Sequence, residues 1–195
     1  MKQPVKTDAS RKKALVCVGS NVTSRWGNPR DTVTEAGKVL SSHLKCELEM
    51  SGLYQTPAFP AGSGQDFVNG AFAFESRLEA GEILAILHQV EALADRERDV
   101  RWGARTLDLD LIALDQIVAP DELTWLDWAN LPLDAQITAA PQQLILPHPR
   151  AHERSFALVP LCDLAPNWRH PILDKTLKQL LDALPPSDVE TVKAL

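Results

Sequence analysis

One alternating segment limits the possible folds of this chain more than any other part of its sequence. From Thr106 to Leu114 the sequence is TLDLDLIAL, with leucines at every second position and Asp108 and Asp110 between them. Because successive side chains of a β-strand point to opposite faces, the pattern predicts a strand that buries its leucines on one side. Both carboxylates then lie on the other side, with their Cα atoms about 6.7 Å apart at roughly 3.3 Å per residue.

The two aspartates allow two interpretations. They can form the solvated acidic face of a half-exposed strand, or they can bind cations, because two ionised carboxylates on one face repel each other. Two divalent metal ions about 4 Å apart would fit their spacing. Residues 96–105, directly before the strand, contain four arginines and Trp102. Arginine binds phosphate groups well, so these neighbours favour a site over a solvated face.

Composition narrows the class of protein and its partners. A length of 195 residues, with 45% hydrophobic and 24% charged residues, is typical of one globular domain. The net charge of −6 argues against a nucleic-acid partner, because such domains usually carry a basic excess. No run approaches the ~18 to 20 apolar residues of a membrane span, so no membrane partner is expected. The three widely spaced cysteines suit reduced thiols in the cytoplasm.

The rest of the chain alternates between strand and helix patterns. Residues 1–13 carry five basic side chains and no apolar segment, so we expect a flexible basic tail before a single domain over residues 14–195. Asn28 and Pro29 predict a helix start, because a capping side chain precedes proline at the first helical position. The expected strands are 14–18, 46–55, 67–75 and 106–114, and the expected helices are 29–44, 79–95, 155–164 and 174–184.

The order of these elements indicates an α+β fold. Strand, helix, strand, strand, helix and strand follow one another, as in the ferredoxin-like βαββαβ arrangement, an antiparallel sheet with helices packed on one face. The C-terminal helices are expected to pack against this core. Residues 116–146, which contain Trp125, Trp128 and three prolines, fit neither pattern and predict an irregular excursion. Long irregular loops are usually functional or flexible, so a lid, a partner surface and an ordered excursion all stay open.

Several short motifs fall on these elements in a recognisable order. They are Gly19-Ser20-Asn21, Tyr54-Gln55-Thr56-Pro57, Phe67-Val68-Asn69, the segment from Arg101 to Asp110, Leu146-Pro147-His148-Pro149 and Arg154-Ser155-Phe156. Together they resemble the 6-hydroxymethyl-7,8-dihydropterin pyrophosphokinases of folate biosynthesis, over roughly residues 14 to 184 without the excursion. The string RWGARTLDLD is highly specific, whereas YQTP and PHP are weak singly and gain weight from their order.

The resemblance implies ATP-dependent transfer of pyrophosphate. The hydroxymethyl oxygen of the pterin attacks the β-phosphorus of ATP and AMP leaves, a reaction that needs mainly positioning and charge neutralisation from the protein. Asp108 and Asp110 are implied to bind two magnesium ions through hard carboxylate oxygens. Arg96 and Arg105 are implied to clamp the phosphates with planar guanidinium groups. The implied catalytic residues are these two arginines and Asp110. Asp110 is also a candidate acceptor for the hydroxyl proton.

The resemblance also implies which residues bind the two substrates. Those for ATP are Glu91, Arg98, Leu111, His148 and Arg154. Those for the pterin are Thr56, Phe67, Asn69, Trp102 and Phe156. The pterin would stack between the two phenylalanines, the asparagine amide would match its polar edge, and Trp102 would lie on a loop that closes over the site.

The chain departs from the family pattern at a few positions. Phe67 stands where tyrosine is frequent, Pro149 stands where an aromatic residue is common, and Ala58 and Phe59 follow Thr56-Pro57 in place of a second proline. The excursion is longer than the usual connection in the family. The first change keeps the stacking surface, and the second removes one expected nucleotide contact.

Two other functions compete with this interpretation. A ferredoxin-like RNA-binding module would use the arginines, but the acidic net charge and the lack of adjacent aromatic residues on the sheet disfavour it. A metal-dependent phosphohydrolase would use the aspartates, but it usually collects more ligands. Neither explains the paired phenylalanines and Asn69. We expect a monomer whose partners are ATP and the pterin, and a small homo-oligomer is the alternative.

Overall fold

β4 is the strand around which the sheet of this protein is built. A computed structural model describes residues 10–58, 64–96, 105–132, 135 and 139–195. The described strands are β1 (Lys12–Ser20), β2 (Glu49–Met50), β3 (Tyr54–Thr56), β4 (Phe67–Ser76), β5 (Asp108–Leu114) and β6 (Lys193–Ala194). β1 pairs with one edge of β4, β3 pairs with the other and β2 also pairs with β4, all antiparallel. The order is β5-β1-β4-β3-β6, so β5 lies at one end of the sheet.

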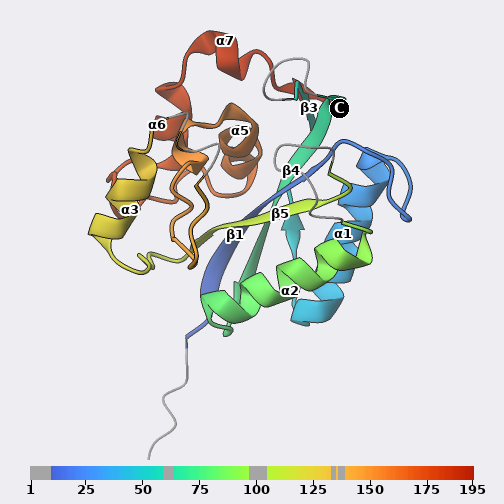
Figure 1. Ribbon diagram of the computed structural model, residues 1–195, viewed down its shortest axis with the longest axis horizontal. Helices are drawn as coiled ribbons and strands as arrows, with labels where there is room; N and C mark the ends of the chain where they lie inside the picture. Colours follow the sequence, from blue (N-terminus) through green and yellow to red (C-terminus); the bar gives the residue numbers. More distant parts are fainter. Residues whose placement is uncertain (1–9, 59–63, 97–104, 133–134, 136–138) are drawn as a thin grey trace, which may run out of the picture.

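Helices cover both faces of this sheet. They are α1 (Pro29–Leu44), α2 (Ala80–Leu93), α3 (Glu122–Ala129), the 3-10 helix η1 (Ala151–Glu153), α5 (Ser155–Leu164), α6 (Leu177–Asp182) and α7 (Pro186–Val189). Figure 1 shows α1 and α2 together on one side, and α3, α5 and α6 away from them on the other. The antiparallel sheet with packed helices is thus confirmed: α1 and α2 share one face of it, and α5 and α6 pack on the other.

Strand alternation explains the two-sided core. Ala14 and Val16 of β1 pack with α1 and α2 in one buried cluster, whereas Leu15 between them packs with α5 and α6 in another. In β5 the leucines predicted to be buried, Leu109 and Leu111, belong to the α1 and α2 side. Their neighbours Asp108 and Asp110 therefore lie on the α5 side.

α1 and α5 begin at the residues that the sequence predicted, Pro29 and Ser155. Asn28 caps α1, its side chain accepting the backbone N–H of Asp31 at 3.0 Å, and Pro29 occupies the first helical position. α5 has the expected bounds. α6, expected from Asp174, begins three residues later because Asp174 has a φ of 51° and Thr176 forms a capping box with Gln179.

The single strand expected at residues 46–55 is wrong. β2 and β3 replace it, separated by a short break in which side chains take over part of the hydrogen bonding. The Ser51 hydroxyl accepts the Ala71 N–H at 2.8 Å, and the Gly52 N–H turns toward the Asp163 carboxylate at 3.0 Å. A strand ladder cannot continue through a residue whose N–H bonds elsewhere.

The expected tail and excursion also need correction. β1 begins at Lys12, inside the tail predicted to reach residue 13, because Lys12 and Lys13 pair with Ser76 and Glu75 of β4. The N–H of Lys13 also donates to Asp115 Oδ1 at 2.8 Å. The excursion is not wholly irregular, since it contains α3, capped by the Asp121 side chain on the Thr124 N–H at 2.9 Å. No helix in the described part of the chain is long and apolar enough to cross a membrane.

Candidate functional site

The sheet register brings residues from distant parts of the chain to one face. Gly19 of β1 is the partner of Asn69 in β4 and of Asp108 in β5. Cys17, two residues earlier on the same face, is the partner of Asp110. Phe67 is two residues from Asn69 and shares its face. The predicted pterin residues of β4 and the predicted metal ligands of β5 therefore flank β1 from its two sides.

Gly19 is needed for this arrangement. A Cβ atom at this position would lie 2.6 Å from Oδ1 of Asn69 and 3.6 Å from Cδ1 of Phe67, so a larger residue would displace the amide. The Asn69 amide is fixed from its other end, because its Nδ2 donates to the Thr56 hydroxyl at 2.7 Å. Thr56 and Asn69 are both buried. Three neighbouring strands thus hold a preorganised amide and hydroxyl beside Phe67.

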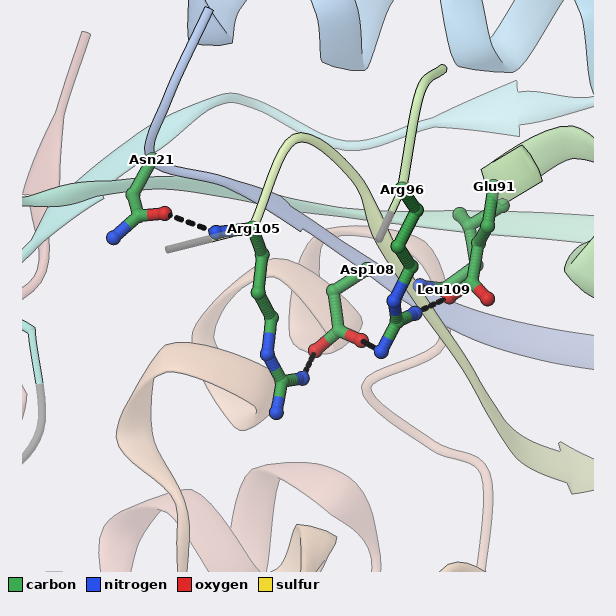
Figure 2. A network of polar contacts seen from close by, with 6 residues as sticks. All are labelled: Asn21, Glu91, Arg96, Arg105, Asp108 and Leu109. Carbon is green, nitrogen blue, oxygen red and sulfur yellow. Dashed lines mark hydrogen bonds and ion pairs between the residues drawn. The ribbon is translucent and has the colours of Figure 1, made fainter. Parts of the chain in front are cut away.

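Asp108 is the centre of a charged network (Figure 2). Its Oδ1 pairs with Arg96 at 2.8 Å and its Oδ2 with Arg105. Arg96 also pairs with Glu91, which is buried on α2 and accepts the N–H of Leu109 at 2.8 Å. Burial alone would raise the pKa of Asp108, but the charges and hydrogen bonds of Arg105 and Arg96 outweigh it and lower the pKa.

Asn21 positions the arginine that follows the undescribed segment. Its Oδ1 accepts the backbone N–H of Arg105 at 2.7 Å, and its own N–H donates to the Arg105 carbonyl at 3.0 Å. Its Nδ2 donates to the carbonyl of Gln65 at 3.1 Å. In the sequence, Asn21 was part of the Gly19-Ser20-Asn21 motif and was assigned no contact of its own, so this role was missed. A polar residue directly after a buried strand was the available signal.

Asp110 has an environment opposite to that of Asp108. Burial, followed by the negative charge of Asp108, raises the pKa of Asp110 to about 6, and Arg154 only partly opposes this. The adjacent thiol of Cys17 has its pKa raised by burial and by Asp110, so it stays protonated. The carboxylate of Asp110 therefore has a deficit of positive charge around it, which a bound cation would offset.

The loop before α5 attaches His148 to the edge of the sheet. The register of β5 against β1 shifts between Leu15 and Val16, and at this irregularity the carbonyl of Ile112 accepts the N–H of His148 at 2.8 Å. The Nδ1 of His148 accepts the N–H of Arg150 at 3.1 Å. Burial and then the charge of Arg154 lower the pKa of His148 to about 3. The ring is thus neutral, with its proton on Nε2 available for donation.

Arg154 and Phe156 lie where α5 begins. The guanidinium carbon of Arg154 is 5.7 Å from the centroid of the Phe156 ring, within the range of a cation–π contact. Burial lowers the pKa of Arg154, while Asp110 opposes this effect. The residue Phe156 is 36% exposed, unlike Phe72 and Phe74 in the core. An exposed aromatic ring next to the charged network is suited to a ligand contact.

The predicted ATP residues partly meet around one cavity of about 420 Å³. Asp110, Leu111, His148 and Arg154 line it, together with Arg150, which the sequence did not indicate. The network around Asp108 instead contains Glu91, Arg96 and Arg105. The residues predicted to bind the pterin on β3 and β4 are Thr56, Phe67 and Asn69. Arg98 and Trp102 lie outside the described residues.

A carboxylate pair beside several arginines is typical of enzymes that transfer phosphoryl groups, since charge neutralisation is their main task. A sequence model of the family described as 7,8-dihydro-6-hydroxymethylpterin-pyrophosphokinase (HPPK) matches residues 15–166. The chain belongs to this family.

Individual relatives agree with the family assignment. A 2-amino-4-hydroxy-6-hydroxymethyldihydropteridine pyrophosphokinase of Synechocystis sp. is 32% identical over 170 residues, which cover 87% of this chain and 74% of the relative. The enzyme of the same name from Bacillus subtilis is 29% identical over 152 residues, 77% of each chain. The structure of wild-type HPPK-DHPS from Plasmodium falciparum has a TM-score of 0.58 at 12% identity. This match covers 91% of this chain and 45% of that longer one, so it supports the fold alone.

Proposed function

We propose that this protein transfers pyrophosphate from ATP to the hydroxymethyl group of 6-hydroxymethyl-7,8-dihydropterin, releasing AMP, in folate biosynthesis. The family match supports this activity. The observation that carries it is the sheet row in which Gly19 lies between Asn69 and Asp108. This row puts a fixed amide and hydroxyl, suited to the polar edge of a pterin, next to a carboxylate and arginine group suited to phosphates.

The residues present fit magnesium. The described residues contain no group of three or more His, Cys, Asp or Glu side chains that could hold a metal ion. The ligands that the described part of the chain would supply are therefore two carboxylates, Asp108 and Asp110. Magnesium commonly binds through one or two carboxylates and completes its shell with water and substrate phosphates. The raised pKa of Asp110 fits a cation site, because a cation would relieve its repulsion from Asp108. We propose that two magnesium ions bind here and supply charge neutralisation along the phosphate chain.

The proposed reaction forms one bond and breaks one. The pterin hydroxyl oxygen attacks the β-phosphorus, the bond from this phosphorus to the oxygen shared with the α-phosphate breaks, and AMP leaves with that oxygen. Asp110 is also the proposed acceptor of the hydroxyl proton, because an ionised carboxylate can act as a general base. Arg96 and Arg105 exchange part of their pairing with Asp108 for pairing with the phosphates.

Each substrate has its proposed group of residues. Phe67 and Phe156 stack on the pterin, and Asn69 with Thr56 binds its polar edge. The residues proposed for ATP are Glu91, Arg98, Leu111, His148 and Arg154, and Trp102 is proposed as part of the closing loop. His148 would donate from Nε2.

The finer points of fold and setting are proposals too. The order β5-β1-β4-β3, with every pair antiparallel, supports the ferredoxin-like βαββαβ core. The two buried clusters share this one sheet, which supports a single domain. We propose that the protein is a cytoplasmic monomer.

A nucleotide-product assay tests the function. The protein is incubated with ATP, magnesium and the hydroxymethyl dihydropterin, and the nucleotides are separated by chromatography. AMP that appears only with the pterin supports the proposal. Phosphate release without the pterin would instead indicate a hydrolase, and no turnover together with RNA retention would indicate a binding module.

A further inference from the structure

The cavity of about 420 Å³ lies beside β5, and the excursion forms one of its walls. Because β5 is the terminal strand of the sheet, residues from both faces reach the cavity, including Leu84 of α2 and Arg154 at the start of α5. Trp128 of α3 and residues 141–145 complete the lining. The volume falls within the ~300 to 1,000 Å³ of small-molecule sites.

The lining contains a charged set and an apolar set. The charged set includes Asp110, His148 and two arginines. One of these, Arg150, has a buried Nη1 for which no hydrogen-bond partner exists among the described residues. A buried donor without a partner costs about 1–3 kcal/mol, and a ligand oxygen would satisfy it. The apolar set is made by Leu84, Leu111, Leu144 and Trp128.

α3 is firmly attached to the loop that carries His148. The indole N–H of Trp125 donates to the carbonyl of Pro147 at 2.7 Å, and this ring packs on His152 and His170 with centroid separations of 5.7 and 5.0 Å. At the base of the excursion, Ala119 and Leu146 exchange two backbone hydrogen bonds of 2.9 Å. The described residues on either side of this wall are therefore held in place by the fold.

Trp128 follows Trp125 by three residues, and residues at this spacing are neighbours on a helix surface. The buried Trp125 fixes the rotation of α3, so the position of Trp128 in the cavity wall is fixed as well. Trp128 itself is only half-buried. A half-exposed indole, held in place at the wall of a cavity, offers a flat apolar surface to a ligand.

We propose that the excursion provides the purine-binding wall of the ATP site, with Trp128 as the residue that contacts the base. This inference rests on the proposed use of ATP. The phosphate chain pairs with the arginines and with the cations at Asp108 and Asp110, so the base is the part of the nucleotide that matches the apolar set. An apolar peptide would leave the buried Nη1 of Arg150 unsatisfied in the same cavity, because the Nε and Nη2 atoms of this guanidinium, and not Nη1, contact Glu153.

Binding measurements on the full chain test the proposal without turnover. Isothermal titration calorimetry compares MgATP with magnesium tripolyphosphate, which has the phosphates but no nucleoside, in the absence of the pterin. Trp128→Ala should weaken ATP binding about tenfold, a size typical of losing an aromatic contact to a base, and leave the Kd of tripolyphosphate unchanged. Trp128→Phe should recover most of the affinity. Leu123→Ala is the control, because Leu123 lies on the same helix and is 76% exposed.

The possible outcomes separate this inference from the proposed function. Equal weakening of both ligands by Trp128→Ala, or no weakening of either, overturns the role of Trp128. If Trp128→Ala does not fold, Trp128→Phe and Trp128→Leu are compared instead, and equal ATP affinity of these two overturns it. Selective weakening of ATP supports the base contact even when no pterin-dependent AMP forms, and that second result would count against the proposed function alone.

Discussion

Glu91 gives the sharpest prediction, because a buried carboxylate on α2 supports both β5 and the arginine network. Its side chain is 2% exposed, accepts the Leu109 N–H at 2.8 Å and pairs with Arg96, which is 17% exposed. Glu91→Leu leaves the Leu109 donor unsatisfied, which costs about 1–3 kcal/mol. Breaking a fully buried ion pair costs about 3–5 kcal/mol, but Arg96 keeps Asp108 as a partner, so a smaller part of this applies.

These effects together predict that Glu91→Leu lowers the free energy of unfolding by about 3 kcal/mol. With a urea dependence of about 2–3 kcal/mol per molar, the unfolding midpoint moves by roughly 1 M. Glu91→Gln keeps an acceptor oxygen for Leu109 and loses only the charge, so about 1–2 kcal/mol is expected. Urea titration followed by circular dichroism measures both changes.

A matched surface substitution decides whether burial is the reason. Glu35 pairs with Lys38 at 2.8 Å on α1, with its side chain 40% exposed, so Glu35→Gln should cost less than about 0.5 kcal/mol. If Glu91→Gln and Glu35→Gln shift the urea midpoint equally, the buried pair of Glu91 and Arg96 stabilises the fold no more than a surface pair, which would contradict the prediction.

Three further predictions concern the site. Gly19→Ala places a Cβ atom 2.6 Å from Oδ1 of Asn69 and so displaces the amide. The KM for the pterin should therefore rise at least tenfold, while the Kd of MgATP stays constant. An unchanged pterin KM would refute the close approach of Gly19 and Asn69. The pKa of Asp108 is lowered, so its charge stabilises the fold above pH ~4, and this stabilisation is lost as the pH falls. The pKa of Asp110 is instead raised from 3.8 to about 6, so its ionisation destabilises the fold as the pH rises from 3.8 to about 6. Asp108→Asn should therefore lower the metal-free melting temperature at pH 7 and Asp110→Asn should raise it; equal shifts would contradict the assigned environments. Because the pKa of His148 is lowered to about 3, nitrogen NMR should show a neutral ring with the proton on Nε2 from pH 5 to 8, and a titration near 6.5 would contradict its burial.

Strand alternation was the sequence pattern that predicted side-chain positions in the site most directly. The pattern TLDLDLIAL placed Leu109 and Leu111 in the core and both aspartates on the opposite face, as the structure has them. The signal is local, because side-chain direction alternates along a regular strand, and in β5 this alternation holds up to the irregularity after Leu111. The cap at Asn28 was equally local, since one side chain and the following proline determine it.

Long-range partners could not be predicted in the same way. The role of Asn21 depends on Arg105, which is 84 residues away, and on the carbonyl of Gln65. The break between β2 and β3 depends on Asp163, which is 111 residues from Gly52. The contact of Asp163 follows from the packing of α5 on the sheet, whereas those of Asn21 join the end of β1 to two other segments. No short-range sequence pattern records either set of contacts.

The excursion shows a different limit of the sequence. α3 has eight residues, and such short helices gain little from intrinsic propensity. Its stability comes from the buried Trp125, whose indole bonds to Pro147 and packs on two histidines. Trp125 was visible in the sequence, but its partners lie 22 to 45 residues further along the chain. The helix therefore depends on tertiary contacts.

Transfer of the β- and γ-phosphates as one unit is the central claim for this protein, and labelled ATP tests it most directly. The protein, magnesium and the hydroxymethyl dihydropterin are incubated in parallel with ATP labelled at the α- or the β-phosphorus, and the products are separated. We predict that the α-label appears only in AMP and the β-label only in the pterin diphosphate. A β-label that appears in ADP, or in phosphate released without the pterin, would contradict the claim.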